Sequence, residues 1–279
     1  MSDTDEPRNH EIKLLMPPTV VLDVGGMPTS DVIETFELRD ESLPMSMQFL
    51  DFQRVLDEHG WNVRLRRKGG THEGELTFKR RFRVEGDSVD AAWQSAREQR
   101  IVGADHFRKQ LEWNLDRRTL SFSREQQFES PADSELDLPD LRRSVAIVLD
   151  ELPGRLRELD LAGESVEHRL KHDACLYGPV TGVRWFGTWN KHDLWIERWD
   201  IPKSKVGPVR VVEASLVKGD YFDALEIQRT LADFLDVRGW LHNQSELKTK
   251  LILDGFAQSG VAASVSGEGV AQAKGGSSR

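Results

Sequence analysis

The run Asn9-His10-Glu11-Ile12-Lys13-Leu14-Leu15 stands near the start of the chain and alternates polar with apolar side chains. In an extended strand, Asn9, Glu11 and Lys13 point to one face, and the residues between them point to the other. A carboxylate and an ammonium two residues apart, opposite an apolar face, indicate a strand whose polar face serves a charged ligand. We therefore expect such a strand at residues 9–16.

The same alternation returns in four later segments, and three of them carry cations on the polar face. The segments, with the charged residues that we single out, are 63–66 (Arg64, Arg66), 75–84 (Lys79, Arg81), 166–171 (Arg169, Lys171) and 212–216 (Glu213). One alternating strand is ordinary, because any half-exposed antiparallel strand has this pattern. Several strands with clustered cations predict a closed barrel whose lumen is lined with positive charge and a few carboxylates.

The composition excludes several classes of protein. With 38% hydrophobic residues the chain supports a sizeable core, and its net charge of −9 argues against a partner such as a nucleic-acid duplex bound through overall basicity. The single cysteine, Cys175, excludes an internal disulfide and a cysteine zinc cluster. Residues 1–8 do not resemble a signal peptide, and no stretch approaches the roughly 18 apolar residues of a membrane span. We expect a cytoplasmic protein without a membrane partner.

The chain divides into a leading segment, one large domain and a tail. Residues 1–8 and 254–279 are expected to be disordered, because they lack a pattern that packs. The domain between them, 9–253, has an extended middle section at 86–160, which is a lid, a dimer surface or extra packing. The further strands expected are 32–38, 62–68, 75–85, a hairpin at 109–129, 166–171, 182–189, 194–199, 210–217 and 247–253. The helices expected are 88–99, 141–159 with a break at Pro153, and 223–236, while residues 45–54 are ambiguous.

The order of these motifs resembles the CYTH superfamily, also called the triphosphate tunnel metalloenzymes. The family opens with a Glu-x-Glu-x-Lys strand, to which residues 9–13 are similar. Its Leu-Arg-x-Arg-like strand resembles Val63-Arg64-Leu65-Arg66, and its Thr-x-Lys strand resembles Leu76-Thr77-Phe78-Lys79. No single motif is specific, and the likeness rests on their order.

The second half of the chain continues this resemblance. The family's late Glu-x-Glu strand, with a glycine turn and a helix after it, resembles residues 213–219. Its penultimate acidic strand resembles residues 195–200, and its closing Ser-Lys element is similar to Ser245 with Lys248 or Lys250. The likeness spans about residues 9 to 253.

The resemblance implies an α+β fold in which a closed, antiparallel, eight-stranded barrel forms a tunnel with flanking helices. It implies a triphosphate-containing small molecule or polyphosphate as partner, Mg²⁺ or Mn²⁺ as cofactor, and a homodimer as one possible assembly. Guanidinium forks and ammonium groups suit phosphate oxygens, and these metals take carboxylate and phosphate oxygens. The implied catalytic residues are Glu11, Lys13 and Glu213, and the implied metal ligands are Glu11, Glu197 and Glu213. The implied substrate-binding residues are Lys13, Arg64, Arg66, Lys79, Arg81, Arg169, Lys171 and Lys250.

Two departures from the family's pattern keep several functions open. Asn9 and Ser215 stand where the family has carboxylates, so each acidic pair has lost one member. The first hypothesis is a metal-dependent hydrolase of inorganic triphosphate or a small organic triphosphate. The alternatives are a class IV-like adenylate cyclase, a protein that binds triphosphate without turnover, and a plain α+β interaction domain whose charged strands face solvent. Taken alone, Glu11 and Lys13 are typical of an ordinary cross-strand surface pair, and the tryptophans, notably Trp185, Trp189, Trp195 and Trp199, are expected to pack in the core or outside the barrel.

Overall fold

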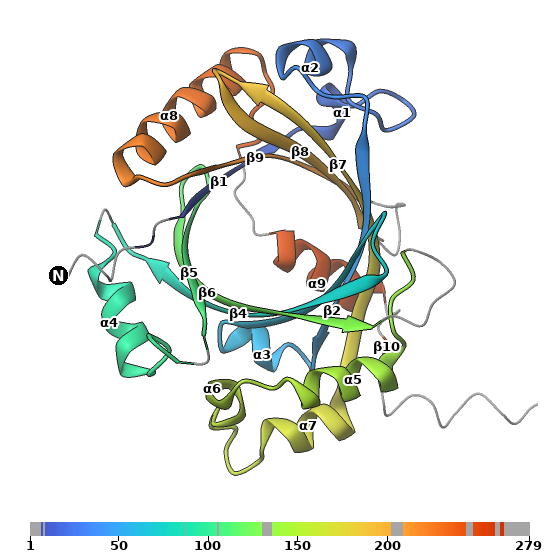
Figure 1. Cartoon of the computed structure of the whole chain (residues 1–279), viewed down its shortest axis with the longest axis vertical. Coiled ribbons are helices and arrows are strands. Elements are labelled where there is room, and N and C mark those ends of the chain that lie inside the picture. Colours follow the sequence, from blue (N-terminus) through green and yellow to red (C-terminus); the bar gives the residue numbers. More distant parts are fainter. Residues whose placement is uncertain are drawn as a thin grey trace, which may run out of the picture.

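The computed structural model describes residues 7, 9–86, 88–104, 106–129, 136–201, 209–243, 248–259 and 263–264. Within these residues the strands form one sheet that curls round and closes on itself (Figure 1). The strands are β1 His10–Met16, β2 Ser42–Asp51, β3 Trp61–Lys68, β4 Glu73–Val84, β5 Arg108–Trp113, β6 Arg118–Glu129, β7 Cys175–Trp189, β8 His192–Ile201, β9 Val209–Lys218 and β10 Ala263–Ser264.

The predicted α+β barrel is confirmed as closed, but the predicted strand number and direction are wrong. In the described part of the chain the ring has nine strands, in the order β7-β2-β3-β4-β6-β5-β1-β9-β8, and β8 pairs with β7 to close it. β1 and β5 are parallel, with Ile12 opposite Trp113, whereas the other neighbours in the ring are antiparallel. The chain passes through α4 (Asp90–Glu98) between β4 and β5, and β6 rather than β5 pairs with β4, so β5 lies beside β1.

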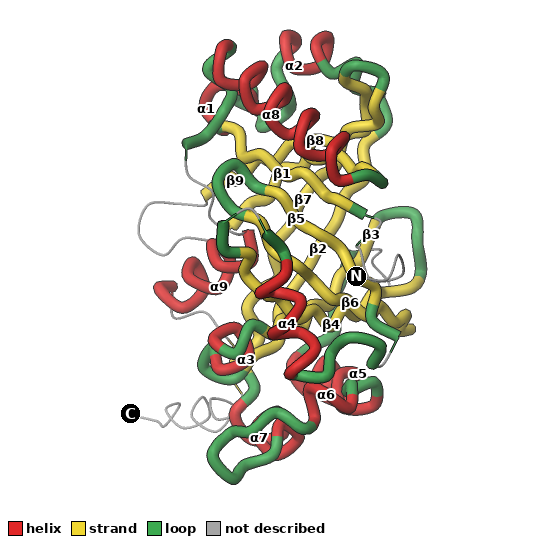
Figure 2. The backbone as a smooth tube through the Cα atoms, turned by 90° about the vertical axis from the view of Figure 1, so that its left-hand side faces the viewer, coloured by secondary structure: helices red, strands yellow, loops and turns green. Residues whose placement is uncertain are grey.

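Helices cover the outer face of the barrel at several places (Figures 1 and 2). α8 lies against β1 and β9, and α4 lies against β4, where Trp93 of α4 packs edge-on to Phe122 with 5.7 Å between ring centroids. The helices are α1 Pro18–Val21, α2 Ser30–Thr35, α3 Val55–Glu58, α4 Asp90–Glu98, α5 Leu141–Asp150, α6 Gly154–Arg157, α7 Val166–Asp173, α8 Tyr221–Val237 and α9 Lys248–Ser259. The expected break at Pro153 is confirmed, because this residue separates α5 from α6.

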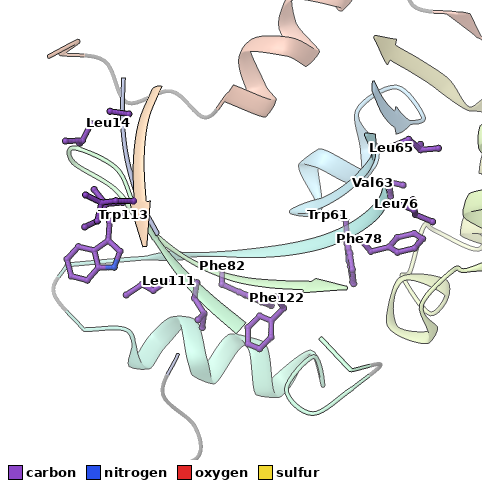
Figure 3. Packing of buried hydrophobic residues seen from close by; sticks show 14 of the residues in the cluster. Leu14, Trp61, Val63, Leu65, Leu76, Phe78, Phe82, Leu111, Trp113 and Phe122 are labelled. Carbon is purple, nitrogen blue, oxygen red and sulfur yellow. The ribbon is translucent and has the colours of Figure 1, made fainter. Parts of the chain in front are cut away.

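The main apolar core lies between the barrel wall and these helices (Figure 3). On β3 and β4, Val63 stands opposite Phe78 and Leu65 opposite Leu76, and all four are almost fully buried. Burying one such side chain contributes about 1.5–3 kcal/mol, so the outward faces of the strands supply much of the folding free energy. The inward faces are thereby available for charged residues.

A second, smaller apolar cluster fills one part of the barrel interior, and α9 takes part in it. Met45, Met47 and Trp199 point inward from β2 and β8, and they pack in one cluster with Ile252 and Phe256 of α9. Figure 1 shows α9 within the outline of the ring. The helix therefore closes off part of the lumen with its apolar face.

Two predicted strands are helices for the same reason. Residues 32–35 of the first lie in α2, whose C-cap is Phe36, and residues 166–171 lie in α7. In each, apolar residues that suit a strand at period two also lie four apart on a helix: Val32 with Phe36, and Val166 with Leu170, all nearly fully buried. The side chain of Ser165 accepts a hydrogen bond from the backbone nitrogen of His168, 3.1 Å away, which caps α7 and decides the ambiguity.

The end of the chain also differs from the prediction. The strand expected at 247–253 is part of α9, which runs on to Ser259 and is followed by β10. Leu247, residues 1–6 and 8, and residues 265–279 lie outside the described residues. The ambiguous segment at 45–54 is largely β2. In the described part of the chain, no helix is long and apolar enough to cross a membrane.

Candidate active site in the barrel lumen

The inward faces of the strands carry a dense set of charged side chains. Residues directly opposite each other on paired strands share a face of the sheet. Ser215 stands opposite both Lys13 and Trp195. Glu197 stands opposite both Glu213 and Arg184. On the other side, Arg66 stands opposite Glu75 and Arg64 opposite Thr77. The described cations with inward ion pairs outnumber the carboxylates that they contact: Lys13, Arg64, Arg66, Lys68, Lys79, Arg81, Arg184 and Lys248 against Glu11, Glu75, Glu112, Glu197 and Glu213.

The first cluster surrounds Glu112 of β5, whose side chain is 3% exposed. Its carboxylate lies 2.6 Å from the ammonium of Lys79, 3.5 Å from that of Lys13 and 3.6 Å from Nε of Arg81. Lys13 also lies 2.6 Å from Glu11. The cluster joins β1, β4 and β5, so the parallel β1–β5 pairing builds it.

Burial and neighbouring charges shift the titration of this cluster. Burial lowers the pKa of Lys79 to about 8, with Lys13 and Arg81 adding to the effect against the attraction of Glu112. Burial also acts to lower the pKa of Lys13, but the carboxylates of Glu11, Glu112 and Glu213 outweigh it and raise that pKa above its usual value. Burial likewise opposes ionisation of Glu112, yet the surrounding cations hold its pKa well below the usual range. The cluster thus has one lysine whose pKa is lower than that of a lysine in water.

The second cluster surrounds Glu75 of β4. Its carboxylate accepts hydrogen bonds from Arg66 at 2.5 Å, Arg64 at 3.1 Å and Lys68 at 3.0 Å. Although burial acts in the opposite direction, these three cations lower the pKa of Glu75 to about 2. Three cations for one carboxylate leave a positive excess at this side of the lumen.

The arginines of the second cluster have unused donor capacity. The Nε atoms of Arg64 and Arg66 are buried and make no hydrogen bond within the described part of the molecule. Burial lowers the pKa of Arg66 to about 10, and the positive charges of Arg64 and Arg184 add to this. The mutual repulsion of these guanidinium groups and their buried, unpaired donors both destabilise the folded protein, and an anion bound between the groups would offset both effects. Arg66, together with Lys68, Glu75 and others, lines a pocket of about 400 Å³.

The third cluster joins two carboxylates that stand directly opposite each other, Glu197 on β8 and Glu213 on β9. Glu197 pairs with Arg184 and accepts a hydrogen bond from Nε1 of Trp199 at 2.9 Å. Glu213 accepts one from the hydroxyl of Ser215 at 3.1 Å. The ammonium of Lys248, from α9, contacts both carboxylates, at 2.6 Å from Glu197 and 3.5 Å from Glu213. Burial opposes ionisation of Glu197, but Lys248 and Arg184 lower its pKa below the usual range.

The donors present fit a divalent metal only if a ligand completes the site. In the described part of the chain no three His, Cys, Asp or Glu side chains group closely enough to hold a metal ion. Mg²⁺, however, is usually bound by one or two carboxylates together with substrate phosphates. Glu197 and Glu213 form such a pair, whereas Glu11 belongs to the first cluster. The chemistry of these donors therefore fits a metal shared with a bound phosphate.

Comparison with known proteins adds distant structural neighbours. No protein-family model matches the sequence, and no curated protein matches it. A protein from Hippeastrum, named as an adenylyl cyclase candidate and described by its dominant triphosphatase activity, is similar in structure at 14% identity and a TM-score of 0.46, over 88% of this chain and 95% of that one. A Pyrococcus horikoshii protein (15% identity, TM-score 0.44) and an adenylate cyclase candidate from Bacillus halodurans (9%, TM-score 0.45) are each covered over 98% of their length and 88% of this chain.

The structure brings most, but not all, of the expected site residues into the lumen. Those brought there are Glu11, Lys13, Arg64, Arg66, Lys79, Arg81, Glu197 and Glu213. Arg169 instead pairs with Glu164 and Asp173 on and beside α7, and Lys171 lies on the same helix. Lys250 is exposed on α9. Lys248, two residues before it, lies instead in the lumen, where Lys250 was expected. Asn9 is exposed, whereas Ser215 is fully buried beside Glu213.

The lumen also contains residues that the sequence did not indicate as functional. Glu112 and Arg184 alternate with apolar residues in predicted strands, which is the signal that identifies lumen residues elsewhere in the chain. The prediction that the tryptophans pack in the core is confirmed for Trp185, Trp189 and Trp199, which are at most 5% exposed and belong to the apolar clusters, whereas the register places Trp195 on the lumen face. Trp195 lies under the guanidinium of Arg184, at 5.2 Å from its ring centroid. Pairing partners decide these positions, and the sequence alone does not name them.

Proposed function

We propose that the lumen binds a triphosphate-containing small molecule or inorganic triphosphate and hydrolyses it with the help of Mg²⁺ or Mn²⁺. The observation that carries this proposal is the excess of partly buried cations, with the unpaired donors of Arg64 and Arg66 among them. A solvated surface does not need such an arrangement, and a polyanion with several phosphate groups neutralises it. The fourth hypothesis, a domain whose charged strands face solvent, does not account for the buried charges.

The arginines and the lysines of the lumen are proposed to contact the phosphates in different ways. Arg64, Arg66 and Arg184 offer forked donors that bind two phosphate oxygens each. Lys13 on β1 and Lys79 on β4 supply point charges close to Glu112. In a site shielded from water these charges attract phosphate more strongly than they do at a surface. A chain of three phosphates thus has contacts along its whole length.

Hydrolysis requires that water attacks the terminal phosphorus and that the bond to the bridging oxygen breaks. Lys13 is proposed to stabilise the negative charge on the leaving group, since carboxylates keep its ammonium protonated. Glu11 is proposed to accept the proton of the water; its carboxylate is held by Lys13 and by the amide of Gln110 at 3.0 Å. Glu197 and Glu213 would hold a metal ion together with the phosphates, and such an ion neutralises phosphate charge and acidifies a bound water.

Phosphate release from tripolyphosphate, ATP and thiamine triphosphate, each with Mg²⁺ and with Mn²⁺, tests the proposal. Metal-dependent release from one of them is the expected result, and its identity names the substrate. Formation of cyclic AMP from ATP would identify a cyclase instead. Absence of both turnover and any rise in melting temperature with these ligands would contradict the proposal.

A second candidate is a protein that binds triphosphate without turnover. The contact of Lys248 with both Glu197 and Glu213 favours it, because an ammonium already neutralises the carboxylates that a metal needs. The replacement of carboxylates by Asn9 and Ser215 favours it as well. A rise in melting temperature with tripolyphosphate, without phosphate release under any metal condition, would establish this candidate. A cytoplasmic location and a homodimer stay predictions.

A further inference from the structure

Lys248 is a cation in the lumen that comes from helix α9 and not from a strand of the barrel. It is the first residue of α9, and its ammonium lies 2.6 Å from Oε2 of Glu197 and 3.5 Å from Oε1 of Glu213. The ammonium also lies 5.0 Å from the ring centroid of Trp199, which adds a cation–π contact. Lys248 therefore contacts both members of a directly opposed inward carboxylate pair.

The two carboxylates are held in place independently of Lys248. Trp199 and Arg184 fix Glu197, and Ser215 fixes Glu213. Like charges directly opposite on neighbouring strands repel each other, and the residues here are only 3% and 5% exposed, so water screens them poorly. An ammonium between them removes this repulsion, as a divalent ion would.

We propose that Lys248 is a built-in counter-cation that competes with divalent metal for Glu197 and Glu213, so that a metal binds this pair only when the Lys248 ammonium withdraws. The inference rests on the proposed function in naming a divalent metal as the competitor. Lys248 thereby sets the metal affinity of the empty lumen.

The packing of α9 allows such a withdrawal without unfolding. Ile252, Leu253 and Phe256 anchor the helix in the inner apolar cluster and are at most 2% exposed. The Lys248 side chain is 21% exposed, and its ammonium sits on a flexible four-carbon stem. The side chain is therefore free to turn away while the apolar face of α9 stays in place.

Binding of Mn²⁺ to the full-length protein without triphosphate, followed by the electron paramagnetic resonance signal of free Mn²⁺, tests this inference. Lys248→Met keeps the aliphatic stem against Trp199 and removes the charge, and we expect it to bind Mn²⁺ about tenfold or more tightly than wild type, because a like charge within about 4 Å no longer opposes the ion. Lys248→Arg keeps the charge and is expected to behave as wild type. Lys191→Gln removes one charge from the exposed turn between β7 and β8 and serves as the matched control.

The origin of the gained affinity is tested in a double variant. Glu213→Gln in the Lys248→Met background is expected to lose the gain. Equal Mn²⁺ affinities of wild type and Lys248→Met, with both proteins folded by circular dichroism, would overturn the inference; if Lys248→Met does not fold, Lys248→Gln is measured in the same way with the same expectation. The readout is independent of turnover, so a gain in Mn²⁺ affinity without any triphosphatase activity refutes the proposed reaction and leaves the inference standing. Triphosphatase activity of the wild-type protein, combined with equal Mn²⁺ affinities of wild type and Lys248→Met, would overturn the inference and support the proposed reaction.

Discussion

Replacing Arg66 by alanine separates ligand binding from folding. The Arg66 side chain is 13% exposed, donates to Glu75 at 2.5 Å and keeps its Nε unpaired. A hydrogen bond to a charged group contributes about 1.5–3 kcal/mol, so the loss of one such bond to a phosphate weakens binding roughly tenfold to hundredfold. We therefore expect Arg66→Ala to raise the Kd for tripolyphosphate by that factor.

The stability of the same variant is expected to change little. Glu75 retains Arg64 and Lys68 as partners, and the removal of Arg66 relieves its repulsion with Arg64 and Arg184. These effects oppose each other, so the free energy of unfolding should change by less than about 1.5 kcal/mol, within the range of ordinary single substitutions.

Isothermal titration calorimetry with tripolyphosphate at low and high salt, combined with urea unfolding, measures both quantities. The affinity of Arg66→Ala should depend less on salt than that of wild type, since one charge in the site is gone. Arg83→Ala, which removes a 70% exposed arginine from the neighbouring strand β4, serves as the matched control and should bind as wild type does. A wild-type isotherm for Arg66→Ala would place Arg66 outside the binding site and refute the reasoning.

Three further predictions follow from single contacts. The affinity for tripolyphosphate should fall as the pH rises above about 8, because Lys79 then loses the proton that an anion favours; Lys79→Arg should remove this decline, and an unchanged pH profile for that variant in calorimetry would exclude Lys79 as its source. Glu11→Gln should lower phosphate release more than about tenfold while shifting the melting temperature by only a few degrees, since its carboxylate is proposed to accept a proton; an unaffected rate would remove Glu11 from the site. Leu170→Ala should cost about 2–5 kcal/mol in urea unfolding, because Leu170 of α7 is fully buried; a loss below about 1 kcal/mol would mean that α7 does not pack as described.

The sequence predicts the barrel strands well where one face is charged and the other apolar. Residues 9–16 and the β3–β4 hairpin have this pattern, and their inward residues Lys13, Arg64 and Lys79 were identified from it. The alternation is unambiguous there because a strand exposes its side chains to two different environments. The same signal predicts that these charged groups share one lumen.

The sequence is ambiguous where apolar residues occur at positions that suit both periods. Val166 and Leu170 fit a strand and a helix equally, and the Ser165 cap decides for the helix. Arg169 was assigned to the lumen for this reason, although α7 holds it against Glu164 and Asp173. Short segments with few apolar residues are thus the positions at which the apolar period alone does not distinguish strand from helix.

Strand partners are the other property that the pattern does not supply. The parallel pairing of β1 with β5 places Glu112 beside Glu11 and Lys13, and residues about 100 positions apart in sequence meet in this way. Lys248 reaches Glu197 only because α9 packs on the inner apolar cluster. Both contacts depend on the closed ring, so no local pattern indicates them.

A crystal structure of the protein with tripolyphosphate bound tests the central claim most directly. We predict that the anion lies in the lumen in contact with Arg64, Arg66 and Arg184 and with Lys13 and Lys79. An anion bound outside the barrel, or a lumen that stays free of it at saturating concentration, would contradict the account.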